Sequence, residues 1–201
     1  MWATASRYRD PMAEVVLFHH ALGLTPGVAA FADALRGAGH LVHTPDLYEG
    51  QVFTDLDEGV AHAGAVGFDT VIDRGAAAVA GLPGSLVYAG FSLGVLPAQR
   101  LAQTRPGARG ALLYHSAAPT GMFGAPWPEG VPAQIHFMAD DPWAAADAEA
   151  ARALCDEAPD AELFVYPGSA HLFADAGLPD YDPDAAALLL SRTLAFLAAL
   201  G

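Results

Sequence analysis

The sequence predicts a three-layer α/β architecture, in which a mostly parallel sheet is covered by helices on both faces. Two observations predict it. Six short runs rich in apolar and β-branched residues recur along the chain, and helical patterns separate them. These runs are apolar along most of their length, which is typical of strands buried on both faces. A third observation concerns size: the 201 residues show no repeat, linker or composition shift, so we expect a single domain over 1–201.

The expected strands begin with EVVLFHH and end with AELFVYPG. Alternation of strands with helices favours parallel pairing, because the chain must return across the sheet between consecutive strands. The six strands are expected at residues 14–20, 41–45, 85–91, 111–116, 133–139 and 161–168.

The first helix is expected within TPGVAAFADALRGAG, residues 25–39. Thr25 is a suitable N-cap and Pro26 suits the first helical position, whereas Gly37 and Gly39 end the pattern.

The other helices are less sharply bounded. DLYEGQVFTDLDEGV reads as a long loop that leads into helical sequence. LGVLPAQRLAQTR, residues 93–105, is helical with a kink or late start at Pro97. Two further helices are expected near 143–156 and 183–200.

The net charge and the cysteine content restrict which binding partners and which cellular compartment we expect. Nine Lys and Arg residues against 23 Asp and Glu give a net charge of −14, which repels nucleic acids and anionic membrane surfaces. The single cysteine, Cys155, cannot form an internal disulfide, which fits a reducing cytoplasm. Residues 1–11 resemble a loose tail without a signal-peptide run. The apolar stretch 185–200 is interrupted by Arg192, so we expect an amphipathic helix rather than a membrane span.

The segment GFSLG, residues 90–94, falls between an expected strand and an expected helix. A sharp strand-to-helix turn strains its middle residue, and Gly90 and Gly94 leave room for it. Ser92 would then stand clear of the sheet beside the free amides of the helix, as a nucleophile requires. The alternative is a glycine-rich turn in which Ser92 only caps the helix.

A serine nucleophile needs a histidine base and an acid that orients the histidine. In folds with a strand–serine–helix turn of this kind, the acid follows the serine in the chain and the histidine follows the acid. Among the downstream histidines, His115 and His136 lie in or at expected strands. His171, in the loop YPGSAHLF after the last strand, has small neighbours that let its ring turn inward. We therefore expect His171 to be the base.

Two adjacent aspartates follow the strand at 133–139. Adjacent side chains diverge, so either Asp140 or Asp141 would hold the imidazole while the other faces solvent or caps the helix near Trp143. The residues themselves leave this choice open, and a capping role for both is the alternative.

Five segments together resemble the dienelactone hydrolase family of α/β-hydrolases: VVLFHHALGL, TPDLYEG, GFSLG, HFMADDPW and YPGSAHLF. The resemblance extends over about residues 14–200 and implies the three-layer α/β-hydrolase fold. The short connections leave no room for a large lid domain. The family pattern also implies Asp141 as the acid, and an oxyanion hole made by the backbone amides of Ala21 and Leu93.

The chain departs from the best-known members at two positions. Ser92 stands where they have cysteine, and His20 stands where they have a glutamate that controls the nucleophile's protonation. The arginines that bind the substrate carboxylate in those enzymes also lack counterparts here. A neutral ester or lactone is therefore a better expected substrate than dienelactone.

Residues expected to line the substrate site are His20, Tyr48, Trp143 and Phe173, which fall at the carboxyl ends of strands or in the loops beyond. For the aromatic residues the alternative is that they only cover the core edge. His19 and His20 are adjacent in a strand and point to opposite faces, so they do not suit one metal ion. We expect neither a metal nor another cofactor.

The sequence thus predicts a cytoplasmic serine hydrolase, a monomer or homodimer, that cleaves a small-molecule ester or lactone through an acyl-enzyme. Thioester or peptide hydrolysis by the same residues is one alternative. A non-catalytic protein of the same fold that binds a small ligand is another.

Overall fold

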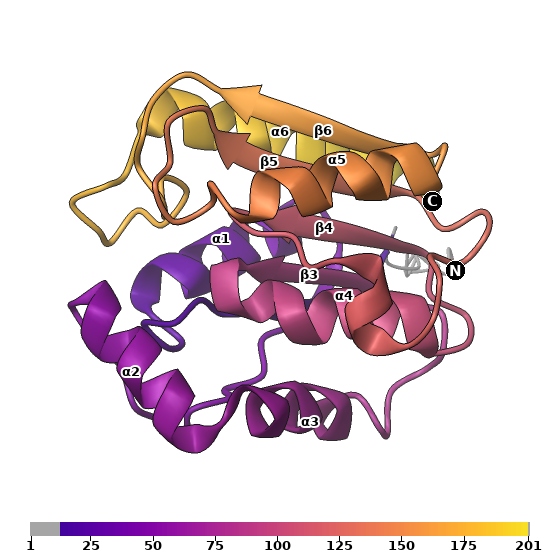
Figure 1. Cartoon of the computed structure of the whole chain (residues 1–201), viewed down its shortest axis with the longest axis horizontal. Helices are drawn as coiled ribbons and strands as arrows, with labels where there is room; N and C mark the ends of the chain where they lie inside the picture. Colours follow the sequence, from indigo (N-terminus) through magenta and orange to yellow (C-terminus); the bar gives the residue numbers. More distant parts are fainter. Residues whose placement is uncertain (1–12, 201) are drawn as a thin grey trace, which may run out of the picture.

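The computed structural model describes residues 13–200, and within this range six strands form one sheet in which every neighbouring pair is parallel (Figure 1). The strand order is β2-β1-β3-β4-β5-β6. All six predicted strands are confirmed, and the expected tail at 1–11 lies outside the described residues. The strands are β1 (Glu14–Phe18), β2 (Leu41–His43), β3 (Val87–Phe91), β4 (Gly110–Tyr114), β5 (Ala133–Met138) and β6 (Ala161–Tyr166).

Helices cover both faces of this sheet, as Figure 1 shows. α1 and α6 pack on one face, whereas α3, α4 and α5 pack on the other with α2 beside them. The fold is therefore the predicted three-layer α/β-hydrolase arrangement without a large additional domain. The helices are α1 (Pro26–Gly37), α2 (Leu56–Val66), α3 (Phe68–Ala78), α4 (Val95–Thr104), α5 (Asp147–Glu157) and α6 (Pro183–Leu200).

The helix boundaries differ from the expectation in two places, whereas α4 has the late start expected near Pro97. The helical sequence after the long loop forms two helices, because Gly67 has a φ of 92° that interrupts the run between α2 and α3. α5 begins at Asp147, four residues after the expected start. Pro97 lies in the first turn of α4, where a missing amide hydrogen costs little.

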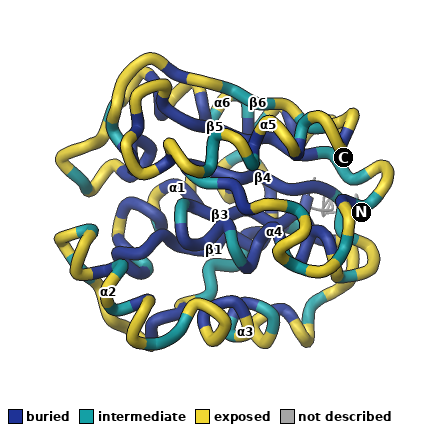
Figure 2. Tube along the Cα trace, in the orientation of Figure 1, coloured by how far each residue is buried: buried dark blue, intermediate teal, exposed yellow. Residues whose placement is uncertain are grey.

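Successive side chains along a strand point alternately into the two core layers, one on each face of the sheet. In β1, Val16 and Phe18 point toward the layer of α3, α4 and α5, whereas Val15 and Leu17 point toward α1 and α6. β3 and β4 are buried along their whole length, and the central strands are dark in Figure 2. Burial on both faces explains why the strands read as continuous apolar runs.

α6 is long and apolar enough to cross a membrane by length and composition alone. Its buried residues recur three or four positions apart and belong to the core that α6 shares with α1 and the sheet. They are Ala185, Ala186, Leu189, Thr193, Phe196 and Leu197.

The turn from β3 to α4 has the strain that the sequence predicted. Ser92 has a φ of 48°, a left-handed conformation that non-glycine residues rarely adopt. A Cβ on Gly90 would collide with the carbonyl of Gly94, and one on Gly94 would lie 2.5 Å from the carbonyl oxygen of Phe18. The turn thus lies directly against the end of β1.

Several histidines are buried and held neutral. Burial lowers the pKa of His19 to about 4, and burial together with the charge of Arg192 lowers the pKa of His136 to about 3. Burial also holds the pKa of His115 well below its usual value, with a smaller contribution from His171. Each ring is therefore uncharged in the folded protein near neutral pH.

Replacing Gly94 by alanine tests the close approach to β1. Gly94→Ala is expected to lower the free energy of unfolding by about 1–3 kcal/mol, because the methyl group overpacks rigid backbone. Gly64→Ala is the matched control, since Gly64 lies in α2 with open space around its Cα and should gain about 0.5–1 kcal/mol. Urea unfolding of both variants measures the difference, and equal effects would contradict the interpretation.

Acid should destabilise the fold because of the buried histidines. Between pH values of about 6.5 and 4 the unfolded chain binds more protons than the folded one, so stability is lost as the pH falls through this range. Each such histidine contributes roughly 1–2 kcal/mol to the loss at pH 5. His136→Asn, which can still bond the Tyr166 hydroxyl, should give a shallower dependence of the melting temperature on pH; an unchanged slope would exclude His136 as a contributor.

Candidate active site

The parallel sheet brings the ends of β1, β3, β5 and β6 to one edge, where ligands bind in open α/β sheets. Ser92 follows β3, and its Oγ lies 2.8 Å from Nε2 of His171, in the loop after β6. Nδ1 of His171 lies 2.7 Å from Oδ2 of Asp141, which follows β5. Three side chains that are 30 to 79 positions apart in the chain therefore form one hydrogen-bonded series.

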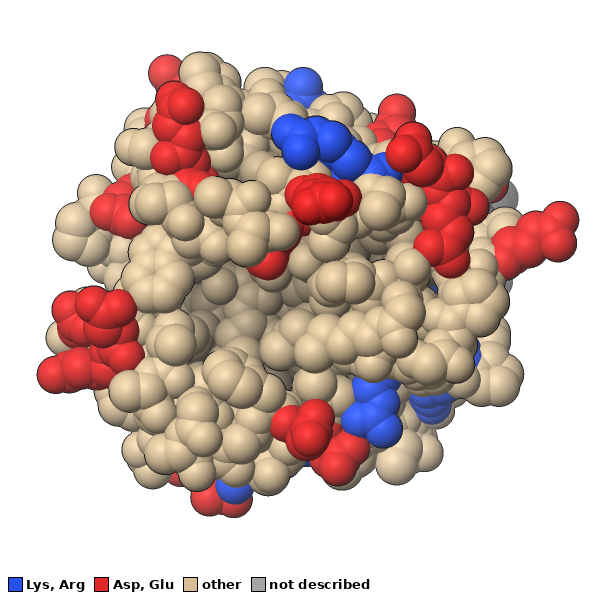
Figure 3. Space-filling model, viewed as in Figure 1, with Lys and Arg blue, Asp and Glu red and all other residues tan. Residues whose placement is uncertain are grey.

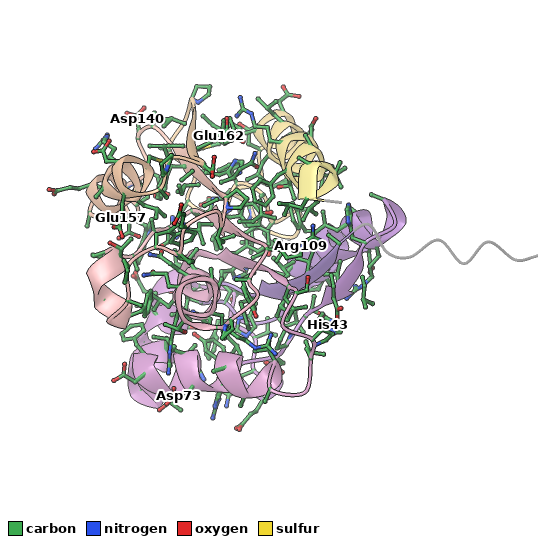
Figure 4. All side chains as sticks on the ribbon, turned by 90° about the vertical axis from the view of Figure 1, so that its right-hand side faces the viewer. His43, Asp73, Arg109, Asp140, Glu157 and Glu162 are labelled. Atoms are coloured by element: carbon green, nitrogen blue, oxygen red, sulfur yellow. The ribbon has the colours of Figure 1, made fainter. Side chains whose placement is uncertain are left out.

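The two aspartates after β5 diverge, as expected. Asp141 is buried, and its second oxygen accepts the backbone amide of Trp143 at 2.9 Å. Asp140 is exposed, and Figure 4 shows it at the outer edge of the molecule. The structure thus brings Asp141, and not Asp140, to His171.

These hydrogen bonds indicate which atoms of the three side chains carry a hydrogen. The Asp141 carboxylate can only accept, so Nδ1 of His171 carries a hydrogen and Nε2 is left as the acceptor for the Ser92 hydroxyl. This is the arrangement that removes a proton from a serine as it attacks a carbonyl. The site is therefore equipped for nucleophilic acyl transfer.

The predicted oxyanion amides belong to two neighbouring turns. Leu93 follows Ser92 in a 3-10 turn, Ser92–Gly94, and Ala21 lies in the tight turn after β1. Gly94 packs against the carbonyls of Phe18 and His19, so the two turns touch. Among the described residues the amide of Ala21 has no protein acceptor, which leaves it available to a ligand.

A hollow lies at this edge of the molecule. In Figure 3 it opens beside the amino-terminal end of α4, the helix that follows Ser92, and its rim is mostly uncharged, with acidic atoms at its upper edge. Trp143 is 45% exposed, and its ring centroid lies 6.0 Å from that of His171. Trp143 therefore lies beside His171 with much of its surface exposed to solvent.

Two aromatic residues expected at the substrate site are in the core instead, and these predictions are wrong. Tyr48 is 1% exposed, because its ring packs edge-on against His19 and its hydroxyl bonds the carbonyl of Gly59. Phe173 is fully buried, with its ring between His115 and Tyr166. Their loops do reach the carboxyl edge, but the rings turn inward.

His20 is also fully buried, so the prediction that it lines the pocket is wrong. Its Nε2 lies 2.8 Å from Oδ2 of Asp175, and its Nδ1 accepts the amide of Leu22. The adjacent His19 is bonded separately, to the amide of Leu47 and the carbonyl of His20. Both rings therefore organise backbone rather than face the hollow.

Two residues near the site were not singled out from the sequence. Asp175 lies four positions after His171 in an acidic loop, and nothing in that pattern separates it from the exposed carboxylates around it. His115 has a φ of 68°, and its ring centroid lies 6.0 Å from that of His171. Neither ring nitrogen of His115 has a hydrogen-bond partner among the described residues.

On the other side of the site, Ser116 follows β4 and donates to Asp147 at 2.6 Å. Burial raises the pKa of Asp147, more than its hydrogen bonds to Ser116 and Ala117 lower it. The Asp147 carboxyl group is thus close enough to His171 and Asp141 to interact with their charges.

Comparisons with known proteins agree with this architecture. The model of the dienelactone hydrolase family matches residues 3–201. A dienelactone hydrolase-like promiscuous phosphotriesterase from metagenomic libraries is 21% identical with a TM-score of 0.76, covering 94% of this chain and 87% of its own. A putative dienelactone hydrolase from Klebsiella pneumoniae is 20% identical with a TM-score of 0.74, covering 96% and 89%.

A putative hydrolase of the α/β superfamily from Xanthomonas campestris is 23% identical with a TM-score of 0.59, covering 94% of this chain and 98% of its own. None of the curated proteins compared with the chain matches it. Because the family model spans nearly the whole chain, the protein belongs to the dienelactone hydrolase family of ester-acting hydrolases.

Proposed function

We propose that the protein is a serine esterase in which Ser92, His171 and Asp141 form a catalytic triad that cleaves a small neutral ester or lactone. The observation that carries the proposal is the continuous series of hydrogen bonds, 2.8 Å from Ser92 to His171 and 2.7 Å from His171 to Asp141. Its distances are those of a nucleophile and base ready for proton transfer.

In the first half of the reaction, Ser92 Oγ attacks the ester carbonyl carbon while Nε2 of His171 takes the hydroxyl proton. Asp141 balances the positive charge that forms on the imidazole. The amides of Ala21 and Leu93 stabilise the oxyanion of the tetrahedral intermediate. When the C–O bond breaks, His171 returns the proton to the leaving alcohol and the acyl group stays on Ser92.

In the second half, a water molecule gives a proton to His171 and attacks the acyl carbon. The second tetrahedral intermediate uses the same two amides. Collapse releases the carboxylic acid, and His171 returns the proton to Ser92 Oγ. For a lactone the leaving alcohol and the acid are parts of one product.

The charges around the site favour a neutral substrate. The contacts of the described arginines lie elsewhere: Arg74 bonds Leu47 and Glu49, and Arg105 bonds the carbonyls of the loop before β3. With Asp147 near His171, a substrate carboxylate would be repelled rather than bound. Trp143 offers an exposed apolar surface beside His171 instead.

A fluorophosphonate probe tests the nucleophile. The wild-type protein should gain one adduct by intact-mass analysis, whereas Ser92→Ala and His171→Ala should gain none. Asp141→Asn should lower kcat/KM for a p-nitrophenyl ester by about 10³–10⁴-fold, because the imidazole loses its orienting carboxylate. The matched variant Asp140→Asn should stay within about twofold. Well-folded wild type without an adduct would overturn the proposal and favour a ligand-binding protein.

Truncating Trp143 tests whether its exposed ring contacts the substrate. Trp143→Ala should raise KM for a naphthyl ester by roughly tenfold and leave KM for a methyl ester nearly unchanged, because only the larger group reaches the ring. Phe68→Ala is the control, since Phe68 is equally exposed but begins α3. If the two esters responded equally to Trp143→Ala, this residue would not contribute to substrate selection.

A further inference from the structure

A second histidine–carboxylate pair lies buried behind the proposed triad. Nε2 of His20 donates to Oδ2 of Asp175 at 2.8 Å, and both side chains are almost completely inaccessible. His20 directly precedes Ala21, whereas Asp175 follows His171 by four positions in the loop between β6 and α6. The pair therefore joins the turn of the oxyanion amide to the loop of the proposed base.

His20 organises the turn that contains Ala21. Its Nδ1 accepts the amide of Leu22 at 3.2 Å, and its carbonyl accepts the amide of Gly23 at 3.0 Å. Acceptance at Nδ1 places the ring hydrogen on Nε2, so the ring is neutral and oriented toward Asp175. The amides on the carboxyl side of Ala21 are thus satisfied by His20, while the amide of Ala21 itself has no acceptor among the described residues.

Three hydrogen bonds hold the Asp175 carboxylate in place. Besides His20, it accepts the hydroxyl of Thr25 at 2.6 Å and the amide of Gly177 at 2.7 Å. Thr25 is also the N-cap of α1, and any side chain on Gly27 would occupy the space of the Asp175 carboxylate. Burial alone would raise the pKa of Asp175, but these hydrogen bonds outweigh burial and lower it, so the group is a carboxylate.

Buried histidine–carboxylate pairs consequently attach the loop after β6 to two other segments of the carboxyl edge. Asp141 after β5 holds His171, and His20 after β1 holds Asp175. β1 and β6 are separated by three strands in the sheet, so no backbone pairing links the two segments. The His20–Asp175 pair is therefore a side-chain link between the residue that precedes Ala21 and the loop that contains His171.

We infer that His20 and Asp175 are positioning residues, which hold the Ala21 amide at the distance from His171 and Ser92 that oxyanion stabilisation requires. Neither residue touches the substrate. The inference rests on the proposed esterase function, and it adds a role for two residues outside the triad. Displacement of an amide by about 1 Å can cost 100-fold in rate, so a small shift of this turn would be measurable.

Three variants distinguish the effect of the bond between His20 and Asp175 from that of the bond between His20 and Leu22. In His20→Asn, the amide oxygen can still accept from Leu22, but the side chain is too short to reach Asp175. In His20→Gln, the longer side chain can donate to Asp175. Asp175→Asn removes the charge of the acceptor. His43→Asn is the matched control, because His43 also bonds a carboxylate, Glu14, at 2.8 Å but lies at the outer strand β2 (Figure 4).

For an ester substrate, kcat should fall about 10- to 100-fold in His20→Asn and Asp175→Asn, with KM within about twofold. The affinity for an aryl boronic acid, which forms a tetrahedral adduct with the serine, should weaken by the same factor as kcat. His20→Gln should recover part of the loss, and His43→Asn should leave both quantities unchanged. The pH profile of kcat/KM should keep its shape, because the triad itself is intact.

A lowered melting temperature with normal kcat and boronate affinity would overturn the inference and leave the pair a purely structural role. A shifted pH profile with unchanged boronate affinity would overturn it as well, since the pair would then act through His171. Hydrogen exchange of the peptide covering 19–24 gives a readout that needs no activity: exchange should accelerate in His20→Asn and Asp175→Asn. If wild type neither hydrolysed esters nor bound the probe, the proposed function would fail, and equal exchange in all variants would then refute the positioning role separately.

Discussion

The close backbone contact between the β3–α4 turn and the end of β1 is the constraint on which the rest of the site depends. Gly94 lies so near the carbonyl of Phe18 that a methyl group does not fit. This contact brings the strained Ser92 and the amide of Leu93 beside the turn of Ala21, and the parallel pairing of β1 with β3 holds the two strands at that spacing. Backbone packing thus places Ser92 and the amide of Leu93 against the end of β1, where the turn of Ala21 begins.

The proposed base, in contrast, is located by side-chain hydrogen bonds. His171 belongs to a loop without strand or helix pairing, and Asp141 and the His20–Asp175 pair tie that loop to the edge of the sheet. Both ties are buried, so water competes little with them. A loop that would otherwise be adaptable is in this way held close to the geometry that proton transfer requires.

Several buried histidine rings lie at this edge of the sheet. His19 and His20 each accept one backbone amide and direct a ring hydrogen elsewhere, and so they shape the turns around the site without adding charge. The ring nitrogens of His115, whose ring centroid lies 6.0 Å from that of His171, have no hydrogen-bond partner among the described residues. This arrangement makes the fold sensitive to acid, because burial lowers the pKa of His19 and His115, and these rings gain a proton on unfolding once the pH falls below about 6.5.

The sequence by itself determined the six strands, the strand–helix turn at Ser92 and the loop position of His171, because apolar runs and glycine sterics act locally. The family pattern added Asp141. Only the tertiary structure decided that Tyr48 and Phe173 face the core and that His20 bonds Asp175, 155 positions away. A linear pattern shows that a loop reaches the carboxyl edge, but the direction of each side chain depends on packing against segments distant in the chain.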